Sequence, residues 1–322
     1  MLLYVTAVVL GTVALVWGAD RFVDGAAALA QRLGVSPIII GLTVVSFGTS
    51  LPELLVSVSA TVMGHPDVAV GNVVGSNIAN IGLILGAASL FRPLMVHGSL
   101  VHREYPLLIG VSVLAWLMAR NGTFSRFEGL LLVAGLALFV AWMTVTAKQG
   151  APEVLLKEAS RAGGVFEEGP SSAKLVFSLL AGLIGLTAGS RFLVWGGVAL
   201  ARTFGVSELV IGLTLVALGT SLPELATSVA GAIKKQDDIA VGNVVGSNLF
   251  NTLAILGIPS LIRPLQVSAE AFHRDFPVML FATLVLWPVC RSWRGRQGRV
   301  NRLEGGALVA GYLVYVGILL KP

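Results

Sequence analysis

The sequence has very little charge and a single cysteine. Charged residues make up 12% of its 322 residues, whereas about a quarter is usual in a soluble domain. Hydrophobic residues make up 55%, so the composition excludes an ordinary soluble domain and predicts an all-α polytopic membrane protein. The lone Cys290 excludes an internal disulfide framework. No compact basic patch accompanies the net charge of +5, so we expect no nucleic-acid binding.

The sequence also lacks the marks of a cleavable signal peptide. No basic segment precedes the first apolar run, and that run continues past the usual length of a signal peptide. Most charges lie in short interruptions between apolar runs, which leaves room for ten helical spans of about 20 residues. The predicted spans are residues 2–30, 37–63, 68–91, 106–119 and 127–146, then 175–201, 209–233, 239–262, 276–290 and 303–320.

The second half of the chain repeats the first. The hexapeptide Gly48-Thr49-Ser50-Leu51-Pro52-Glu53 returns as Gly219-Thr220-Ser221-Leu222-Pro223-Glu224, at an offset of 171 residues. Internal similarity at this scale indicates duplication, and an odd number of spans in each half inserts the second half the other way round. We therefore predict two inverted-topology repeats of five helices. They are residues 1–146 and 174–322, joined by a cytoplasmic linker at 147–173.

Basic residues are distributed unevenly between the predicted loops on the two sides of the membrane. If the amino terminus lies outside, the inner loops hold most of the lysines and arginines. The positive-inside rule then places both termini outside and the linker in the cytoplasm. We expect a multi-pass protein of the cell (inner) membrane, surrounded by the lipid bilayer.

Each hexapeptide places a glutamate beside a proline in the middle of a span. A carboxylate at such depth costs roughly 2.5–3.5 kcal/mol on insertion scales, so its presence in both halves indicates a function. Proline has no N–H, which should free the carbonyl of Gly48 and that of Gly219. A free carbonyl, two hydroxyls and a carboxylate suit a hard cation such as Ca²⁺, Na⁺ or Mg²⁺. The two hexapeptides therefore predict an intramembrane cation site.

A polar stripe on the next span of each half supplies a second wall for this site. Asn72, Ser76 and Asn80 are spaced by four residues, so they share one face of an otherwise apolar helix. Amide and hydroxyl oxygens are neutral ligands for cations. We expect Ser76, Asn80, Ser247 and Asn251 to face the glutamates, and Asn72, Asn77, Asn243 and Asn248 to make hydrogen bonds between helices.

The paired hexapeptides, each followed by Gly-Asn-Val-Val-Gly-Ser-Asn, closely resemble the alpha repeats of the calcium/cation antiporter superfamily. Its best-known members are sodium/calcium exchangers, and this chain resembles the short bacterial branch over nearly its whole length. The resemblance implies that helices 2, 3, 7 and 8 surround the ions while helices 1 and 6 slide across them. It assigns the ligands to Thr49, Ser50, Glu53, Ser76 and Asn80, to Thr220, Ser221, Glu224, Ser247 and Asn251, and more weakly to backbone carbonyls near Ser46 and Ala217.

The function implied by this resemblance is secondary active antiport of Ca²⁺ against Na⁺, by alternating access at one shared site. It implies no catalytic residue, no cofactor and no protein partner. Some relatives carry an aspartate where Asn251 stands, so only two carboxylates serve this site, and their charge matches one Ca²⁺. The alternatives are Ca²⁺/H⁺ antiport with the same glutamates, a cation channel, and an intramembrane metal-dependent hydrolase, for which the spans offer no histidine near the site.

Three charged residues lie deep in the first predicted span. Arg21 and Asp24 are spaced to pair on one helix face, with Asp20 next to them. In the second half, Arg191 matches Arg21. We interpret these residues as a structural ion pair, and the alternative is a role in gating or ion entry.

Overall fold

The structure is a computed structural model that describes residues 1–96, 98–161, 171–205, 217–290 and 298–320. Nearly all of these residues are helical, and the strands among them are four segments of two residues each. Seven of the described helices are long and apolar enough to cross a membrane, or eight if a bent pair counts as one span. The all-α polytopic fold predicted from composition is therefore confirmed.

The elements follow one another in similar order in the two halves. The first half contains α1 (Leu2–Leu33), α2 (Pro37–Ile40), the π-helix η1 (Gly41–Val45), α3 (Ser46–Thr49), α4 (Leu51–Val62), α5 (Pro66–Ala79), the π-helix η2 (Asn80–Leu85), α6 (Gly86–Phe91), β1 (Leu94–Met95), α7 (Gly98–His102), α8 (Glu104–Met118), the 3-10 helix η3 (Ala119–Asn121), β2 (Thr123–Phe124) and α9 (Arg126–Arg161). The second contains α10 (Ser172–Thr203), α12 (Ala217–Thr220), α13 (Leu222–Ile233), α14 (Asp237–Phe250), the π-helix η5 (Asn251–Ile255), α15 (Gly257–Ile262), β3 (Leu265–Gln266), the π-helix η6 (Ala271–Asp275), α16 (Phe276–Cys290), β4 (Arg299–Val300) and α17 (Arg302–Leu319).

Most of the ten predicted spans correspond to described helices, with differences at the seventh and the ninth span. The span predicted at 209–233 falls partly on residues 206–216, which lie outside the described residues. The span predicted at 276–290 begins earlier, because η6 leads directly into α16. The count of ten spans and the inverted arrangement of the halves stay predictions.

The predicted linker is partly helical. α9 continues to Arg161, well beyond residue 146, where the fifth span was expected to end. Hydropathy marks where a helix leaves the apolar core, while alanine, glutamate, leucine and lysine after that point still favour helix. Residues 162–170 of the predicted linker lie outside the described residues.

Two short antiparallel ribbons join the halves. β1 pairs with β4, with Leu94 opposite Val300, and β2 pairs with β3, with Phe124 opposite Leu265. Leu94 and Leu265 are separated by the same 171 residues as the two hexapeptides. Each ribbon thus takes one strand from each half.

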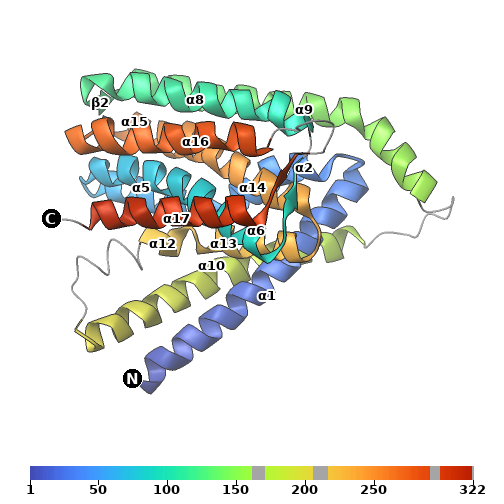
Figure 1. The fold of residues 1–322 in the computed structure, drawn as a ribbon, viewed down its shortest axis with the longest axis horizontal. Helices are drawn as coiled ribbons and strands as arrows, with labels where there is room; N and C mark the ends of the chain where they lie inside the picture. The colour runs from blue at the N-terminus through green and yellow to red at the C-terminus, as the bar shows by residue number, and fades with distance from the viewer. Residues whose placement is uncertain (97, 162–170, 206–216, 291–297, 321–322) are drawn as a thin grey trace.

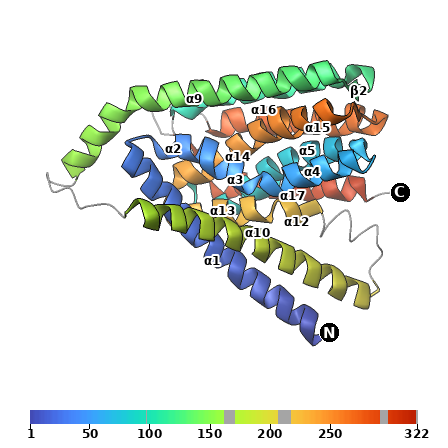
Figure 2. The same ribbon diagram turned by 180° about the vertical axis from the view of Figure 1, so that it is seen from behind.

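The pair formed by α1 and α10 runs obliquely across one side of the molecule. Figure 1 shows the remaining long helices, among them α8, α9, α16 and α17, roughly aligned with one another, whereas α1 and α10 slant away from them. The view from behind in Figure 2 shows the same pair next to α13. This arrangement sets one long helix pair apart from the bundle that contains the hexapeptides.

Glycines allow α1 and α10 to touch along their backbones. A Cβ atom added to Gly18 would lie 2.5 Å from the backbone nitrogen of Leu186, and one added to Gly189 would lie 2.5 Å from that of Leu15. Small residues at such positions let membrane helices approach closely without a hydrophobic driving force. The sequence signal for this contact is a glycine every seven residues, as Gly11, Gly18 and Gly25 on α1 and Gly182, Gly189 and Gly196 on α10.

Candidate functional site

Each hexapeptide interrupts its helix. α3 ends at Thr49 and α4 begins at Leu51, and the two helical segments are bent by 44°. Ser50 lies at the break with φ −86° and ψ 4°, and Ser221 lies at the break between α12 and α13 with φ −89° and ψ 5°. Pro52 is in the first turn of α4, where the missing N–H removes no helical hydrogen bond. The interruption predicted from the prolines is therefore confirmed in both halves.

The carbonyls expected to be freed by the prolines have different surroundings. The hydroxyl of Ser190 on α10 donates a hydrogen bond of 2.5 Å to the carbonyl of Gly219, which takes one of its two lone pairs. Gly48 lies against the ring of Phe22 on α1, since an added Cβ would be 3.0 Å from the ring. The two glycines therefore pack against different long helices, Gly48 against α1 and Gly219 against α10.

The two glutamates are buried, and each meets the opposite half. Glu53 and Glu224 are each 1% exposed. The hydroxyl of Ser50 donates to Oε1 of Glu224 at 2.9 Å, and the hydroxyl of Ser221 donates to Oε1 of Glu53 at 3.3 Å. The second oxygen, Oε2, of each glutamate has no hydrogen-bond partner in the described part of the chain. The two carboxylates are thus linked crosswise by serines, with one oxygen of each left over.

Two asparagines present their carbonyl oxygens in the same way. Asn80 and Asn251 begin the π-helices η2 and η5, a wider helical form that is frequent at functional sites. The amide nitrogen of Asn80 donates to Oδ1 of Asn248 at 2.8 Å, and that of Asn251 donates to Oδ1 of Asn77 at 3.1 Å. With their nitrogens fixed, Asn80 and Asn251 each keep an Oδ1 that has no partner among the described residues.

The other stripe asparagines hold the backbone beside the glutamates. The amide nitrogen of Asn72 donates to the carbonyl of Glu53 at 3.2 Å and to the hydroxyl of Ser57 at 2.9 Å. Asn243 makes the equivalent two bonds in the second half, at 3.3 and 3.0 Å. The predicted hydrogen-bonding role of Asn72 and Asn243 between helices is therefore confirmed, as is that of Asn77 and Asn248.

Hydroxyls complete the buried polar cluster. Ser247 is fully buried, and its Oγ has no hydrogen-bond partner within the described residues. Ser76 is 6% exposed and lies 3.5 Å from the hydroxyl of Ser221, measured between their oxygens. Thr49 is fully buried and donates to Oδ1 of Asn243 at 3.1 Å. Ser76 and Thr49 thus each contact a polar group of the opposite half.

The weaker candidate positions are less clearly part of the cluster. The carbonyl of Ser46 accepts a hydrogen bond of 3.0 Å from the backbone N–H of Ser50. Ala217 begins α12, and its side chain lies outside the described residues. Thr220, which belongs to the main set of predicted ligands, lines a cavity between α4 and α10.

The atoms of this cluster that keep no hydrogen-bond partner among the described residues, and could therefore bind a metal ion, are oxygens. Within the described ranges, no group of three histidine, cysteine, aspartate or glutamate residues gathers closely enough to hold a metal ion. Carboxylate, amide and hydroxyl oxygens suit Ca²⁺ and Na⁺ better than zinc or copper. The unpartnered oxygens come from α4, α13, α14, η2 and η5, which pack against one another. They are Oε2 of Glu53 and Glu224, Oδ1 of Asn80 and Asn251, and Oγ of Ser247.

A cleft between α4 and α10 opens toward this cluster. It has a volume of about 500 Å³, and its lining includes Pro52, Ser59, Arg191 and Thr220. A neighbouring cavity of about 760 Å³ shares Pro52 and Arg191 with it and extends along α10. Arg191 therefore lies at a route from the surface to the second hexapeptide.

On the other side of the site, α1 is held against α13. Lys234 at the end of α13 forms salt bridges of 2.6 Å with both Asp20 and Asp24, and it also donates to the carbonyl of Asp20 at 3.0 Å. The prediction that Arg21 pairs with Asp24 is therefore wrong. Asp20 and Asp24 are four residues apart on one face of α1, so a single lysine from another helix can bind both.

Comparison with known proteins agrees with this geometry. The family described as "Sodium/calcium exchanger protein" matches residues 3–145 and 174–321. CaxA of Alkalimonas amylolytica, named a putative antiporter, is 44% identical over 322 residues, which is 100% of both chains. The "Sodium/calcium exchanger MaX1" of Methanosarcina acetivorans is 33% identical over 96% of each chain, and the "Inner membrane protein YrbG" of Escherichia coli is 40% identical over 99% of this chain and 97% of its own.

A solved structure extends the likeness to three dimensions. The sodium-calcium exchanger NCX_Mj, soaked without Na⁺ and Ca²⁺, is 31% identical, covers 99% of both chains and gives a TM-score of 0.83. The two matched segments of the family leave out the whole predicted linker and little else. The resemblance stated from the two hexapeptides is confirmed, and the chain belongs to the sodium/calcium exchanger family.

Proposed function

We propose that the chain is a secondary active antiporter that exchanges Ca²⁺ for Na⁺ by alternating access at the buried oxygen cluster. The observation that carries this proposal is the pair of buried glutamates, each bound by a serine of the opposite half and each keeping one unpartnered oxygen within the described chain. A buried charged group without a partner is costly, and a transported cation supplies the missing partner. Membership of the exchanger family supports the same assignment.

The transported ions bind to oxygens from both halves. Glu53 and Glu224 carry the charge, and the neutral oxygens complete the coordination of an ion that has lost its water. Hydroxyls tied to the helix breaks and amides tied to the π-helices hold their oxygens in place before an ion arrives. The proposed ligands are Thr49, Ser50, Glu53, Ser76 and Asn80, with Thr220, Ser221, Glu224, Ser247 and Asn251, and the carbonyls near Ser46 and Ala217 are secondary candidates for Na⁺.

Sharing one site makes the exchange obligatory. Two carboxylates neutralise one Ca²⁺, so the loaded site carries no net charge from these groups. Na⁺ binds to the same oxygens, so the two ions compete. Without an ion, two carboxylates would have to pass through an apolar barrier unpaired, which costs several kcal/mol. The chain therefore changes facing only when loaded.

The cleft beside α10 lies on the open side of the site, and the salt bridges of α1 lie on its closed side. Ions reach the cluster through the cleft between α4 and α10, while α1 closes the opposite side by contact with α13. In the predicted orientation, the open side faces outward. Movement of the α1–α10 pair relative to the hexapeptide helices would close one side and open the other.

Uptake of ⁴⁵Ca²⁺ into Na⁺-loaded proteoliposomes tests the function. We expect Glu53→Gln and Glu224→Gln each to abolish Na⁺-dependent uptake, because each removes half of the charge that neutralises Ca²⁺. Glu270→Gln is the matched control, since Glu270 is an exposed residue before η6. Uptake like that of the wild type in either site variant would overturn the proposal.

The driving ion is tested by varying three gradients independently. With Na⁺, K⁺ and pH gradients imposed in turn, a Na⁺ gradient should drive Ca²⁺ uptake and the other two should not. Uptake driven by a pH gradient without Na⁺ would instead assign Ca²⁺/H⁺ antiport to the same glutamates. A single-channel current would assign a channel.

The placement in the membrane is part of the proposal. Both termini lie outside the cell (inner) membrane, and the halves 1–146 and 174–322 have opposite orientations, joined by the cytoplasmic linker 147–173. The similar protein YrbG is named as an inner membrane protein, which supports this location. In a Cys290→Ala background, an impermeant maleimide applied to intact cells should label His65→Cys and spare Ser171→Cys. The reverse pattern would invert the orientation.

A further inference from the structure

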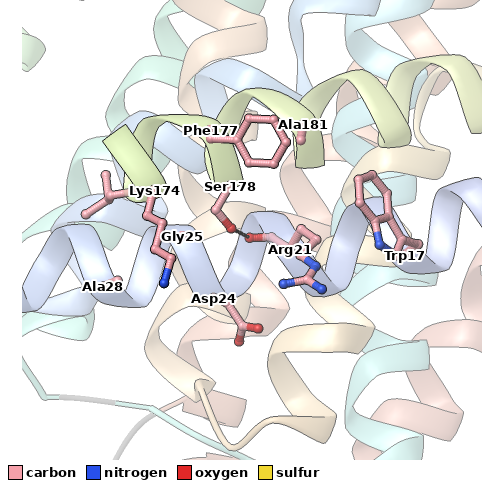
Figure 3. A pocket seen from close by; sticks show the side chains of 10 residues that line it. Trp17, Arg21, Asp24, Gly25, Ala28, Lys174, Phe177, Ser178 and Ala181 are labelled. Carbon is pink, nitrogen blue, oxygen red and sulfur yellow. Dashed lines mark hydrogen bonds between the residues drawn. The ribbon is translucent and has the colours of Figure 1, made fainter. Parts of the chain in front are cut away.

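A groove with a mixed lining lies between α1 and α10, at the end where α10 begins. Its volume is about 510 Å³, and its lining includes the rings of Trp17 and Phe177 together with Arg21, Asp24 and Lys174. Figure 3 shows the charged ends of Arg21 and Lys174 on either side of Asp24. The groove therefore combines two cations with apolar rings on one helix pair.

The acidic groups beside this groove are already paired. Asp24 and Asp20 are each bound to Lys234 at 2.6 Å. Neither Arg21 nor Lys174 takes part in a salt bridge with any residue that the structure describes. Because cations on membrane-spanning helices are costly unless they find an opposite charge or reach water, these two favour an anionic partner.

The apolar part of the groove identifies the class of partner. Phe177 is 71% exposed and Trp17 is 45% exposed, so both rings face the surroundings of the helix pair. A free inorganic anion would use the two cations and leave the rings without contact. A phospholipid has a phosphate for the cations and acyl chains for the rings, and tryptophan favours the boundary between headgroups and chains.

We propose that this groove binds an anionic phospholipid, with its phosphate contacting the charged ends of Arg21 and Lys174 and its acyl chains along Trp17 and Phe177. The lipid contacts both walls of the groove and therefore joins α1 to α10 at the end opposite the amino terminus of the chain. In the predicted orientation this is the cytoplasmic leaflet, where anionic lipids attract basic side chains. The inference depends on the groove residues alone, so it stands or falls independently of the transported ions.

Native mass spectrometry of the purified full chain tests the proposal directly. The chain is titrated with phosphatidylglycerol and, separately, with zwitterionic phosphatidylcholine, and the dissociation constant of the first bound lipid is measured. We expect phosphatidylglycerol to bind more tightly than phosphatidylcholine. Arg21→Gln and Lys174→Gln should each weaken it about fivefold and the double variant roughly 25-fold, the size expected for each surface cation acting on an anionic lipid.

Controls separate charge from folding and lipid from free phosphate. Arg120→Gln removes an exposed arginine at the far end of α8 and should leave the affinity unchanged. The charge-conserving double variant Arg21→Lys, Lys174→Arg should keep the affinity within about twofold, which shows that loss in the glutamine variants follows charge. Inorganic phosphate should not displace the lipid. Equal affinities for the wild type and the double glutamine variant, or for the two lipids, would overturn the proposal.

Discussion

The two members of the long helix pair contact the hexapeptide helices in different ways. α1 is tied to the end of α13 by the two salt bridges of Lys234, whereas α10 leaves a cleft of about 500 Å³ against α4. The offset of 170 residues that relates Arg21 to Arg191 places Ser190 and Val194 where α1 has its two aspartates. The second half thus has no charge at these two positions.

The ion cluster, in contrast, is nearly the same in both halves. Ser50 and Ser221 each donate a hydrogen bond to the carboxylate of the opposite half. Asn80 and Asn251 are likewise fixed by asparagines of the opposite half, Asn248 and Asn77. A cation that is reached from two sides needs equivalent ligands from both. The contacts that close each side do not need to match. The duplicated halves have therefore diverged along α1 and α10, while the proposed ligands have stayed alike.

The largest effect is expected from separating α1 from α10. Gly18→Val places methyl groups where even a Cβ would lie 2.5 Å from the backbone of Leu186, which cannot move aside as a side chain can. We expect unfolding to become easier by about 1–3 kcal/mol, the usual cost of overpacking, and Ca²⁺ uptake to fall to background. Thermal unfolding and flux measurements check both effects.

The matched control for this substitution lies on α17. Nothing among the described residues lies within 4 Å of a Cβ added to Gly311, so Gly311→Ala should be neutral in both measurements. Normal transport by Gly18→Val would show that α1 and α10 do not need this close contact to move as one unit. The contrast between the α1 side and the α10 side of the site would then not describe a single moving pair.

A smaller effect is expected at the ligands, where the halves should behave alike. Asn251→Asp keeps its hydrogen bond to Oδ1 of Asn77 only when the new carboxyl is protonated, and Asn80→Asp has the same relation to Asn248. Losing the hydrogen bond costs about 1–3 kcal/mol, but the ionised aspartate also adds a negative charge beside the bound cation, and that attraction is worth about 4 kcal/mol per unit charge at 4 Å in a medium of effective dielectric about 20. The ratio of variant to wild-type Ca²⁺ affinity should therefore rise as pH rises, equally for both variants.

The control for this pair is Asn121→Asp. Its side-chain oxygen accepts a hydrogen bond from the backbone N–H of Thr123, and an aspartate can still accept that bond at any pH. A flat pH profile for this variant would attribute the change at the site to the carboxylates placed beside the cation at positions 80 and 251. Unequal profiles for those two would show that the cluster is less symmetric than its hydrogen bonds.

The smallest effect is expected from loosening α1. Lys234→Met installs the residue found at the matching position of the first half, Met63, and removes both salt bridges. Asp20 and Asp24 are 52% and 56% exposed, so each bridge is worth roughly 0.2–1 kcal/mol after screening by solvent. The population with the α4–α10 cleft open should fall severalfold.

Labelling of the cleft measures this population. In a Cys290→Ala background, Ser59→Cys places a thiol on the cleft lining, and its rate of reaction with a maleimide reports how often the cleft is open. Adding Lys234→Met should slow the reaction. An unchanged rate would mean that the salt bridges do not keep the opposite side, between α1 and α13, closed.

The buried polar cluster around the two glutamates could be predicted from the sequence because its causes are local. A proline beside a glutamate interrupts a helix wherever it occurs in a span, and residues four apart share a helix face whatever surrounds them. Spacing alone therefore places Ser76 with Asn80, and Ser247 with Asn251, on one face of each helix. Membrane spans follow from apolar runs in the same way.

The contacts of α1 could not be predicted, because their causes are distant. Arg21 and Asp24 have a favourable local spacing, and only the position of Lys234, more than 200 residues further on, decides that the lysine binds the aspartates instead. The hydrogen bond from Ser190 to Gly219 likewise depends on how α10 lies against the bundle. The fifth span was predicted within a residue or two, but the continuation of α9 beyond it was not, because hydropathy reports the membrane and not the helix.

The two ribbons and the crosswise serines have a consequence for how such a molecule is put together. Each half lacks one strand of both ribbons and lacks the hydroxyl that holds its own carboxylate. Neither half could therefore assemble a working unit by itself, and a half-length gene product would need a second copy to complement it. Two separately translated halves are expected to restore exchange only when they are produced in the same cell.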